Sequence, residues 1–259
     1  MNWCRYRVGE KVVDGIIEDD IVWEATESPF EGGVATGERQ LLSHVSLCLP
    51  CIPANFYAAG ANYRGHLAWA ADNLGGNGKE PSRADIGYRA NNSLVAQGEH
   101  ITIPRDSSGL VQAEGELVAV IGKMAKPLTR RNALDFVLGY TIGNDVSERT
   151  WQSSDRTLWR AKNTDTFNPM GPWITPGLDP EALEVTTRIN GVEVSHYHTK
   201  DMIFSLIDFL VETTKYVTLY AGDVMWMGCD GATPVIKSGD VVEIEIPEIG
   251  VLRNPVVGE

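Results

Sequence analysis

Short apolar runs, several of them alternating strictly with polar residues, dominate the chain and predict β-strands. The clearest alternation is VVEIEI at Val241–Ile246, which predicts a strand with one buried and one solvent-facing side. Asn190-Gly191 separates two such runs and predicts a two-residue hairpin turn. The other strands predicted after residue 93 are Glu99–Ile103, Leu117–Ile121, Val137–Ile142, Trp173–Ile174, Val185–Ile189, Val192–Ser195 and Asp223–Met227.

Helical spacing of apolar residues is confined to a few segments. Lys200–Tyr216 carries an apolar stripe that predicts a core-facing helix. Arg130–Phe136 predicts a short helix with Thr129 as its N-cap, and the Ala-rich segment His66–Asn73 predicts another. The Gly-rich stretch Leu74–Pro81 that follows is typical of a lid loop.

This distribution predicts two domains. Residues 1–50 are expected to form a small β-rich N-terminal domain, in which Asp14-Gly15 predicts a hairpin turn between short apolar runs. Residues 51–259 are expected to form the catalytic domain. Many strands with few helices predict a β-rich α+β fold.

Composition narrows the classes of partner. The chain has 259 residues, and its 43% hydrophobic content is enough to bury a full core. Its net charge of −13 repels nucleic acids and anionic membrane surfaces, so neither is an expected partner. The sequence has no apolar run near the roughly 20 residues of a membrane span and no signal-peptide core, which predicts a soluble, cytoplasmic protein. The pair Cys48-Leu-Pro-Cys51 has redox spacing, but it contains Pro50 and is followed by Pro53 in a predicted loop, which favours two incidental thiols.

Three carboxylates stand beside two of the predicted strands. Glu114 and Glu116 lie two residues apart in VQAEGELVAV, so a strand would point both to one side, about 7 Å apart. Such a pair is stable with a divalent cation, with a bound proton, or as solvated acids at a strand end. Asp145 follows the apolar run Val137–Ile142 and is placed to meet them. Three hard oxygen ligands suit magnesium, manganese or calcium, and such an ion can stabilise the enolate of a 1,3-dicarbonyl or 2-oxo acid.

The chain resembles the fumarylacetoacetate hydrolase superfamily from about Leu42 to Val257. The segments that carry the resemblance, in the order and spacing of the family, are GANYRGH, EGELVAVIGK, VLGYTIGNDVSERTWQ, WRAKNTDTFNPMGPWIT, RINGVEV, DMIFSLIDFL, AGDVMWMG and SGDVVEIEIPEIGVLRNPV. The resemblance implies a mixed β-sandwich roll preceded by a small N-terminal domain, and commonly a homodimer.

The resemblance also implies a metal site and substrate contacts. Glu114, Glu116 and Asp145 match the ligands of Mg²⁺ or Mn²⁺, with Ca²⁺ as an alternative occupant in crystals. Lys162 matches a lysine that contacts the substrate's oxyanion or carboxylate, where its ammonium adds positive charge beside the developing enolate. Other positions that match residues near a small oxo-acid substrate are Tyr63, Arg149 and Gln152.

Three positions depart from the family pattern. His66 is the candidate general base, but Trp69 stands where many members carry a glutamate that orients this histidine, and Asp72 is a poor geometric substitute. Cys229 replaces a hydroxyl that usually holds a substrate carboxylate. In the lid region, Arg89 takes the place of a lysine and can clamp a carboxylate as a rigid fork. These departures concern the substrate and the reaction more than the metal.

A second histidine pair, His196 and His198, shares the spacing of some metal ligands. Its position after the Asn190-Gly191 turn favours exposed strand-end residues over a metal role.

The resemblance and the acids together predict a metal-dependent hydrolase that cleaves a carbon–carbon bond of an acylpyruvate or related β-dicarbonyl acid. A decarboxylase, isomerase, hydratase or lyase on the same metal site is the alternative, because loss of the glutamate partner weakens water activation and leaves enolate stabilisation intact. A catalytically inactive binding homologue is the non-enzymatic alternative. Retention of all three acids and of Lys162 argues against it.

Overall fold

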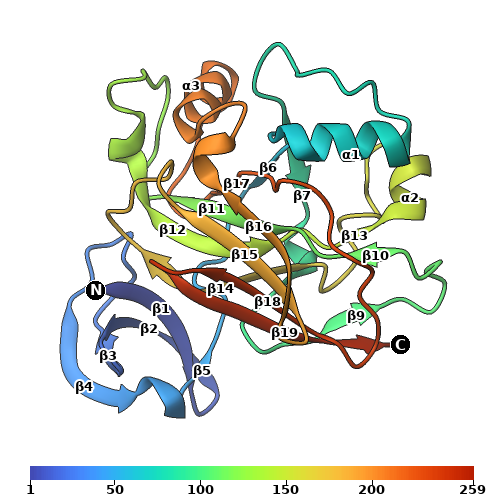
Figure 1. Ribbon diagram of the computed structural model, residues 1–259. Helices are drawn as coiled ribbons and strands as arrows, with labels where there is room; N and C mark the ends of the chain where they lie inside the picture. Colours follow the sequence, from blue (N-terminus) through green and yellow to red (C-terminus); the bar gives the residue numbers. More distant parts are fainter.

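The computed structural model describes residues 1–259 and shows a β-rich fold built from two packed mixed sheets (Figure 1). The larger sheet has the order β4-β3-β2-β1-β14-β12-β11-β17-β6-β7, with β5 on β1 and β8 on β14. Its strands are β1 (Asn2–Val8), β2 (Lys11–Glu18), β3 (Ile21–Ala25), β4 (Ala35–Leu41), β5 (Ser46–Leu47), β6 (Phe56–Ala59), β7 (Ile86–Arg89), β8 (Leu94–Val95), β11 (Gly115–Ile121), β12 (Val137–Asn144), β14 (Asn168–Thr175) and β17 (Val224–Trp226).

The second sheet has the order β16-β15-β18-β19-β9 and packs against the first, with β15 against β11, β18 against β12 and β19 against β14. Inward-facing apolar residues of both sheets form the main core, as the alternation along β18 predicts. The strands are β9 (Ile101–Ile103), β15 (Glu184–Ile189), β16 (Val192–His198), β18 (Val241–Ile246) and β19 (Gly250–Gly258), and a separate short pair joins β10 (Val111–Gln112) to β13 (Ser147–Glu148).

Three α-helices lie on one side of the sheets, at the top of Figure 1: α1 (Arg64–Leu74), α2 (Arg149–Ser154) and α3 (Leu206–Tyr216). Single 3₁₀ turns complete the chain at η1 (Leu42–His44), η2 (Asn91–Ser93), η3 (Ala133–Phe136) and η4 (Thr199–Asp201). None of the helices has both the length and the apolar character needed to cross a membrane. The three α-helices and the loops beside them thus cover the same side of the two sheets (Figure 1).

The N-terminal strands β1–β5 curl into their own layer at the lower left of Figure 1, around a small apolar cluster that includes Tyr6 and Val22. They join the larger sheet where Trp3 of β1 pairs with Ile174 of β14. The expected domain boundary at residue 50 falls in the loop between β5 and β6.

Asp14-Gly15 is not a hairpin turn, and that prediction is wrong. Both residues lie inside β2, and the glycine is required by packing: a Cβ at Gly15 would lie 2.8 Å from Tyr6 Cε1 and 2.8 Å from Val22 Cγ1. In contrast, Asn190-Gly191 is the predicted hairpin turn, with positive φ angles of 54° and 77°.

Two of the predicted helices need correction, and one helix was missed. The segment predicted at Arg130–Phe136 forms only the 3₁₀ turn η3. The Thr129 side chain does not cap this turn; instead its carbonyl oxygen accepts hydrogen bonds from Asn132 N and Ala133 N. The helix predicted from Lys200 begins at Leu206, because Ser205 and Asp208 form a capping box that defines its start. The helix α2 was not predicted, since its six residues are too few to show a period.

Candidate active site

Three carboxylates meet where β11 and β12 pair. Glu114 directly precedes β11, Glu116 is its second residue, and Asp145 directly follows β12. The antiparallel register, together with a 2.9 Å hydrogen bond from Asp145 N to Glu114 O, holds the two strand ends together. All three side chains are buried, and one oxygen of each lies within 4.8 Å of the others. The structure therefore brings together the three acids predicted as metal ligands.

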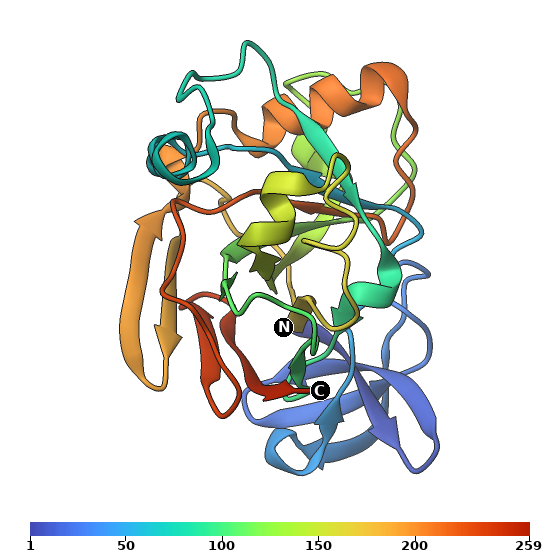
Figure 2. The ribbon, with the colours of Figure 1, turned by 90° about the vertical axis from the view of Figure 1, so that its right-hand side faces the viewer.

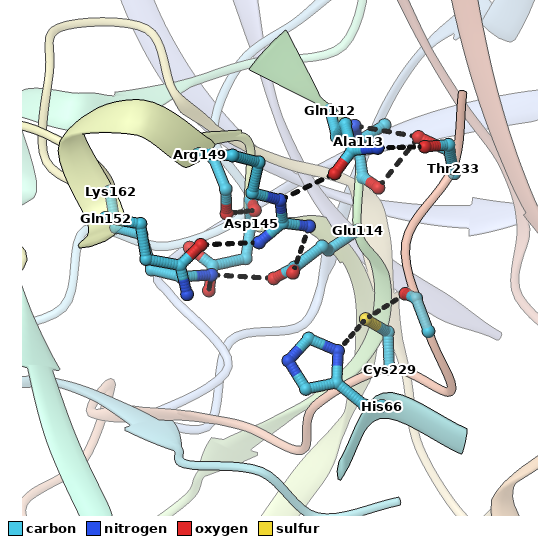
Figure 3. A network of polar contacts seen from close by, with 12 residues as sticks. His66, Gln112, Ala113, Glu114, Asp145, Arg149, Gln152, Lys162, Cys229 and Thr233 are labelled. Carbon is cyan, nitrogen blue, oxygen red and sulfur yellow. Dashed lines mark hydrogen bonds and ion pairs between the residues drawn. The ribbon is translucent and has the colours of Figure 1, made fainter. Parts of the chain in front are cut away.

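Three cationic side chains contact two of these acids, and Figure 3 shows two of the three, Lys162 and Arg149. Lys162 Nζ donates to Glu114 Oε2 at 2.6 Å and to Asp145 Oδ2 at 2.7 Å. Arg149 Nη2 donates to Glu114 Oε1 at 2.7 Å, and Arg89 Nη2 to Asp145 Oδ2 at 2.7 Å. Burial raises the pKa of Glu114, but the charges of Lys162 and Arg149 outweigh it and hold that pKa at about 2. The pKa of Asp145 is likewise held below its usual range, because Arg89 and Lys162 outweigh burial.

Glu116 differs because it contacts no cationic side chain. Its Oε2 accepts one hydrogen bond, from Gly228 N at 2.8 Å. Burial, followed by the charges of Asp145 and Glu114, raises its pKa well above the ordinary value. A buried carboxylate beside two others is stabilised by a divalent cation, and a donor set made only of oxygens fits Mg²⁺ or Mn²⁺. The residues present therefore fit the metal that the resemblance implies.

The lone imidazole of the site comes from α1. His66 is half-buried, and its Nδ1 lies 3.9 Å from Cys229 Sγ, which also donates to Gly231 O at 3.1 Å (Figure 3). Burial lowers the pKa of His66, which favours the neutral ring near pH 7. Burial raises the pKa of Cys229 well above its usual value, so this side chain is a neutral thiol. His66, Glu114 and Cys229 also have ligand atoms within 4.8 Å of one another.

Trp69 occupies the α1 position at which a carboxylate partner for His66 would stand. The rings of Trp69 and His66 have centroids 5.7 Å apart, and the Arg149 guanidinium carbon lies 4.6 Å from the Trp69 ring centroid, a cation–π contact. Asp72 is exposed and makes no hydrogen bond or ion pair. His66 therefore has a thiol, an indole and the Glu114 carboxylate nearby, and no acid of its own helix contacts it.

A pocket of about 220 Å³ opens above these groups. Tyr63 and Arg149 do not line the pocket. Tyr63 is buried, with its ring centroid 4.9 Å from that of Tyr197, and Arg149 contacts Glu114. The predicted site residues that do line the pocket are His66, Arg89, Glu114, Glu116, Asp145, Gln152, Lys162 and Cys229. This volume suits a substrate with only a few carbons.

Sequence reasoning missed two supporting side chains. Asn168 Nδ2 donates to Asp145 Oδ1 at 3.0 Å, and Gln112 Oε1 accepts from Arg149 Nε at 2.7 Å. Both lie inside or beside the motifs that carry the family resemblance, but their roles depend on contacts between segments far apart in the chain. Asn168 therefore orients Asp145, and Gln112 orients the Arg149 guanidinium that contacts Glu114.

Comparison with known proteins finds similarity to one family. The family model described as fumarylacetoacetate (FAA) hydrolase C-terminal matches residues 55–257. The mitochondrial oxaloacetate tautomerase fahd2 of Xenopus laevis is 35% identical over 228 residues, a match that covers 83% of this chain and 69% of the relative. The 2,4-didehydro-3-deoxy-L-rhamnonate hydrolase of Sphingomonas sp. (strain SKA58) is 34% identical over 211 residues and covers 77% of this chain and 72% of the relative.

A solved structure matches over the whole chain. The X-ray structure of 5-carboxymethyl-2-hydroxymuconate delta-isomerase from Mycobacterium smegmatis superposes with a TM-score of 0.89 at 34% identity, and the match covers 100% of both chains. The relatives thus share the fold and differ in the reactions for which they are named.

Proposed function

The chain belongs to the fumarylacetoacetate hydrolase family, and from this premise we propose that it is a divalent-metal-dependent enzyme that interconverts the keto and enol forms, or the double-bond isomers, of a small 2-oxo acid. The observation that carries the proposal is the contrast within the pocket. The three acids and Lys162, which would hold a cation and stabilise an enolate, lie together, while His66 makes no hydrogen bond to a carboxylate. Relatives named as a tautomerase and an isomerase support the same reaction class.

The charges of the site favour an anionic transition state. A divalent cation held by Glu114, Glu116 and Asp145 would supply Lewis-acid stabilisation of an enolate oxygen. Lys162 places an ammonium group against two of these acids, so its positive charge lies beside the position where negative charge develops. These side chains are almost fully buried, which strengthens the electrostatic interactions between them.

His66 is the proton carrier in this proposal. Because Nδ1 faces Cys229 Sγ, Nε2 is left to accept a proton from the carbon next to the carbonyl and to return it. Enolate formation requires only this proton transfer between the substrate carbon and His66. Hydrolysis also requires a water molecule that is activated as a nucleophile. A carboxylate partner would raise the basicity of His66, and none is present on α1. We therefore prefer tautomerisation or isomerisation over carbon–carbon hydrolysis, which is the reverse of the order predicted from the sequence.

Carbon–carbon hydrolysis is the second candidate. A neutral His66 lines the same pocket as the three acids, so it can accept a proton from water as well as from carbon. The relative named as a hydrolase, at 34% identity, supports retaining this candidate.

A substrate panel separates the candidates. Protein treated with a chelator and reloaded with Mg²⁺ or Mn²⁺ is mixed with oxaloacetate and with acylpyruvates, while enol absorbance, carbon dioxide and carboxylic-acid products are measured. The proposal expects metal-dependent keto–enol exchange or isomerisation that is faster than any cleavage. Stoichiometric acid pairs from acylpyruvates without such exchange would establish hydrolysis, and carbon dioxide as the main product would establish a decarboxylase. No activity and no calorimetric metal binding would identify an inactive relative.

A further inference from the structure

The hairpin formed by β15 and β16, at the left-hand edge of Figure 2, carries a cluster of metal-ligating side chain types that do not line the pocket. In its register Glu184 pairs with His198, and Thr186 pairs with His196. Residues two apart on a strand face the same side, so these four side chains form one patch. Glu184 and His196 are exposed, His198 is half-buried and Thr186 is buried, and β16 is the edge strand of its sheet.

The cluster has the spacing of a coordination site. His198 Nε2 lies 3.3 Å from Glu184 Oε1, and His196 Nε2 lies 3.8 Å from Glu184 Oε2. Ligand atoms of all three residues lie within 4.8 Å of one another. Two ligands about 2.0–2.1 Å from a tetrahedral zinc ion are roughly 3.3 Å apart, so small side-chain rotations bring all three onto one ion.

One histidine is already oriented for this role. His196 Nδ1 lies 3.0 Å from Thr186 Oγ1. When Nδ1 carries the proton it donates to this hydroxyl oxygen, which leaves Nε2 with its lone pair directed toward Glu184. Such a hydrogen bond on the far nitrogen is the usual way in which a protein selects the tautomer of a metal-binding histidine.

We propose that Glu184, His196 and His198 bind a divalent cation of the zinc class, with water completing the coordination. Two imidazoles and one carboxylate favour Zn²⁺, Co²⁺ or Ni²⁺ over Mg²⁺, which prefers oxygen ligands only. The site is therefore chemically distinct from the carboxylate site in the pocket. Because its ligands come from both strands, the ion fastens the edge strand β16 to β15.

The experiment titrates zinc into protein whose carboxylate site is saturated with Mg²⁺. Isothermal calorimetry compares wild type with the His196→Ala/His198→Ala double variant, and His100→Ala serves as a control that removes an exposed histidine from a loop. Wild type and the control are expected to bind one more equivalent of Zn²⁺ than the double variant. Thr186→Val keeps all three ligands but loses the orienting hydroxyl, and we expect it to weaken binding about 10-fold.

Cobalt distinguishes this site from the thiol-containing cluster in the pocket. Co²⁺ on the hairpin gives visible d–d bands without a thiolate charge-transfer band, whereas Co²⁺ on His66 and Cys229 gives both. Equal zinc stoichiometry in wild type and in the folded double variant would overturn the proposal. So would a cobalt spectrum that shows thiolate ligation only.

Discussion

Lys162 contacts two of the three acids of the site, because its one ammonium group forms ion pairs with both Glu114 and Asp145. We predict that Lys162→Met lowers kcat about 100-fold or more with a smaller change in KM, because the lost charge acts mainly on the enolate-like transition state. Mg²⁺ affinity measured by calorimetry is expected to stay equal or rise, because the variant leaves two acids with less positive charge nearby. Lys215→Met, on the exposed side of α3, is the matched control. A loss of metal binding that accounts for the lost activity would contradict this role.

Trp69 lies beside His66 on α1, at the position where an acid would orient the imidazole. We predict that Trp69→Glu raises the ratio of acylpyruvate cleavage to tautomerisation at least about 10-fold, because a carboxylate one helical turn from His66 strengthens it as a base. Trp69→Gln is the matched control: it also loses the cation–π contact with Arg149 but gains no charge. The two rates are measured side by side on the metal-loaded variants. Equal ratios in the two variants would show that the acid partner does not set the reaction.

At the scale of elements, α3 is anchored by the capping box of Ser205 and Asp208 and by an ion pair between Asp208 and Arg130. Burial raises the pKa of Asp208, but the hydrogen bonds from Ser205 and Arg130 outweigh it, so the folded-state pKa is lowered. A lowered carboxyl pKa stabilises the fold above the unfolded-state value of about 3.9, and this contribution is lost as the pH falls through the folded value.

We therefore predict that Asp208→Asn is less stable than wild type by a constant amount between about pH 5 and pH 7, and that the difference shrinks below about pH 4. Urea unfolding across this range measures it. Asp72→Asn, on the exposed side of α1, serves as the control and is expected to show no such trend. If the difference in unfolding free energy between Asp208→Asn and wild type persists unchanged at pH 3, the charge of Asp208 does not stabilise the start of α3.

The elements that sequence patterns predicted well are those defined by local rules. The alternation in β18 and the Asn190-Gly191 turn depend on neighbouring residues only, and the structure has both. Gly15 was misread because the side chains that require it lie on β1 and β3. The acids of the site could be predicted from strand spacing and family motifs. Glu184 could not be joined to the histidine pair, because that depends on the register of β15 against β16.

At the scale of the whole molecule, the homodimer remains a proposal. One face of the structure is a candidate for its interface. The larger sheet ends at β7, an edge strand with exposed backbone groups. Tyr88 on this strand and Tyr216 on α3 are exposed to 62% and 67%, and both line a hollow of about 360 Å³. We predict that wild type sediments as a dimer and that Tyr216→Glu shifts it toward monomer. Trp159→Glu, equally exposed elsewhere, is the control, and an unchanged dimer in Tyr216→Glu would place the interface on another face.

A cation bound in the pocket would couple this site to the stability of the whole chain. A ligand that binds only the folded state at 100 times its Kd adds about 2.7 kcal/mol to the free energy of unfolding, which for a chain of this length raises Tm by roughly 5–10 °C. We predict this increase when Mg²⁺ is added to chelator-treated protein, measured by scanning calorimetry. Glu116→Gln is the decisive variant, because Glu116 contacts no cationic side chain and its only hydrogen bond, from Gly228 N, can be kept by an amide oxygen. Removal of a buried charge beside two others leaves the metal-free variant as stable as wild type or more so, while the Mg²⁺-dependent increase is lost. An equal Mg²⁺ shift in both proteins would show that the cation binds elsewhere.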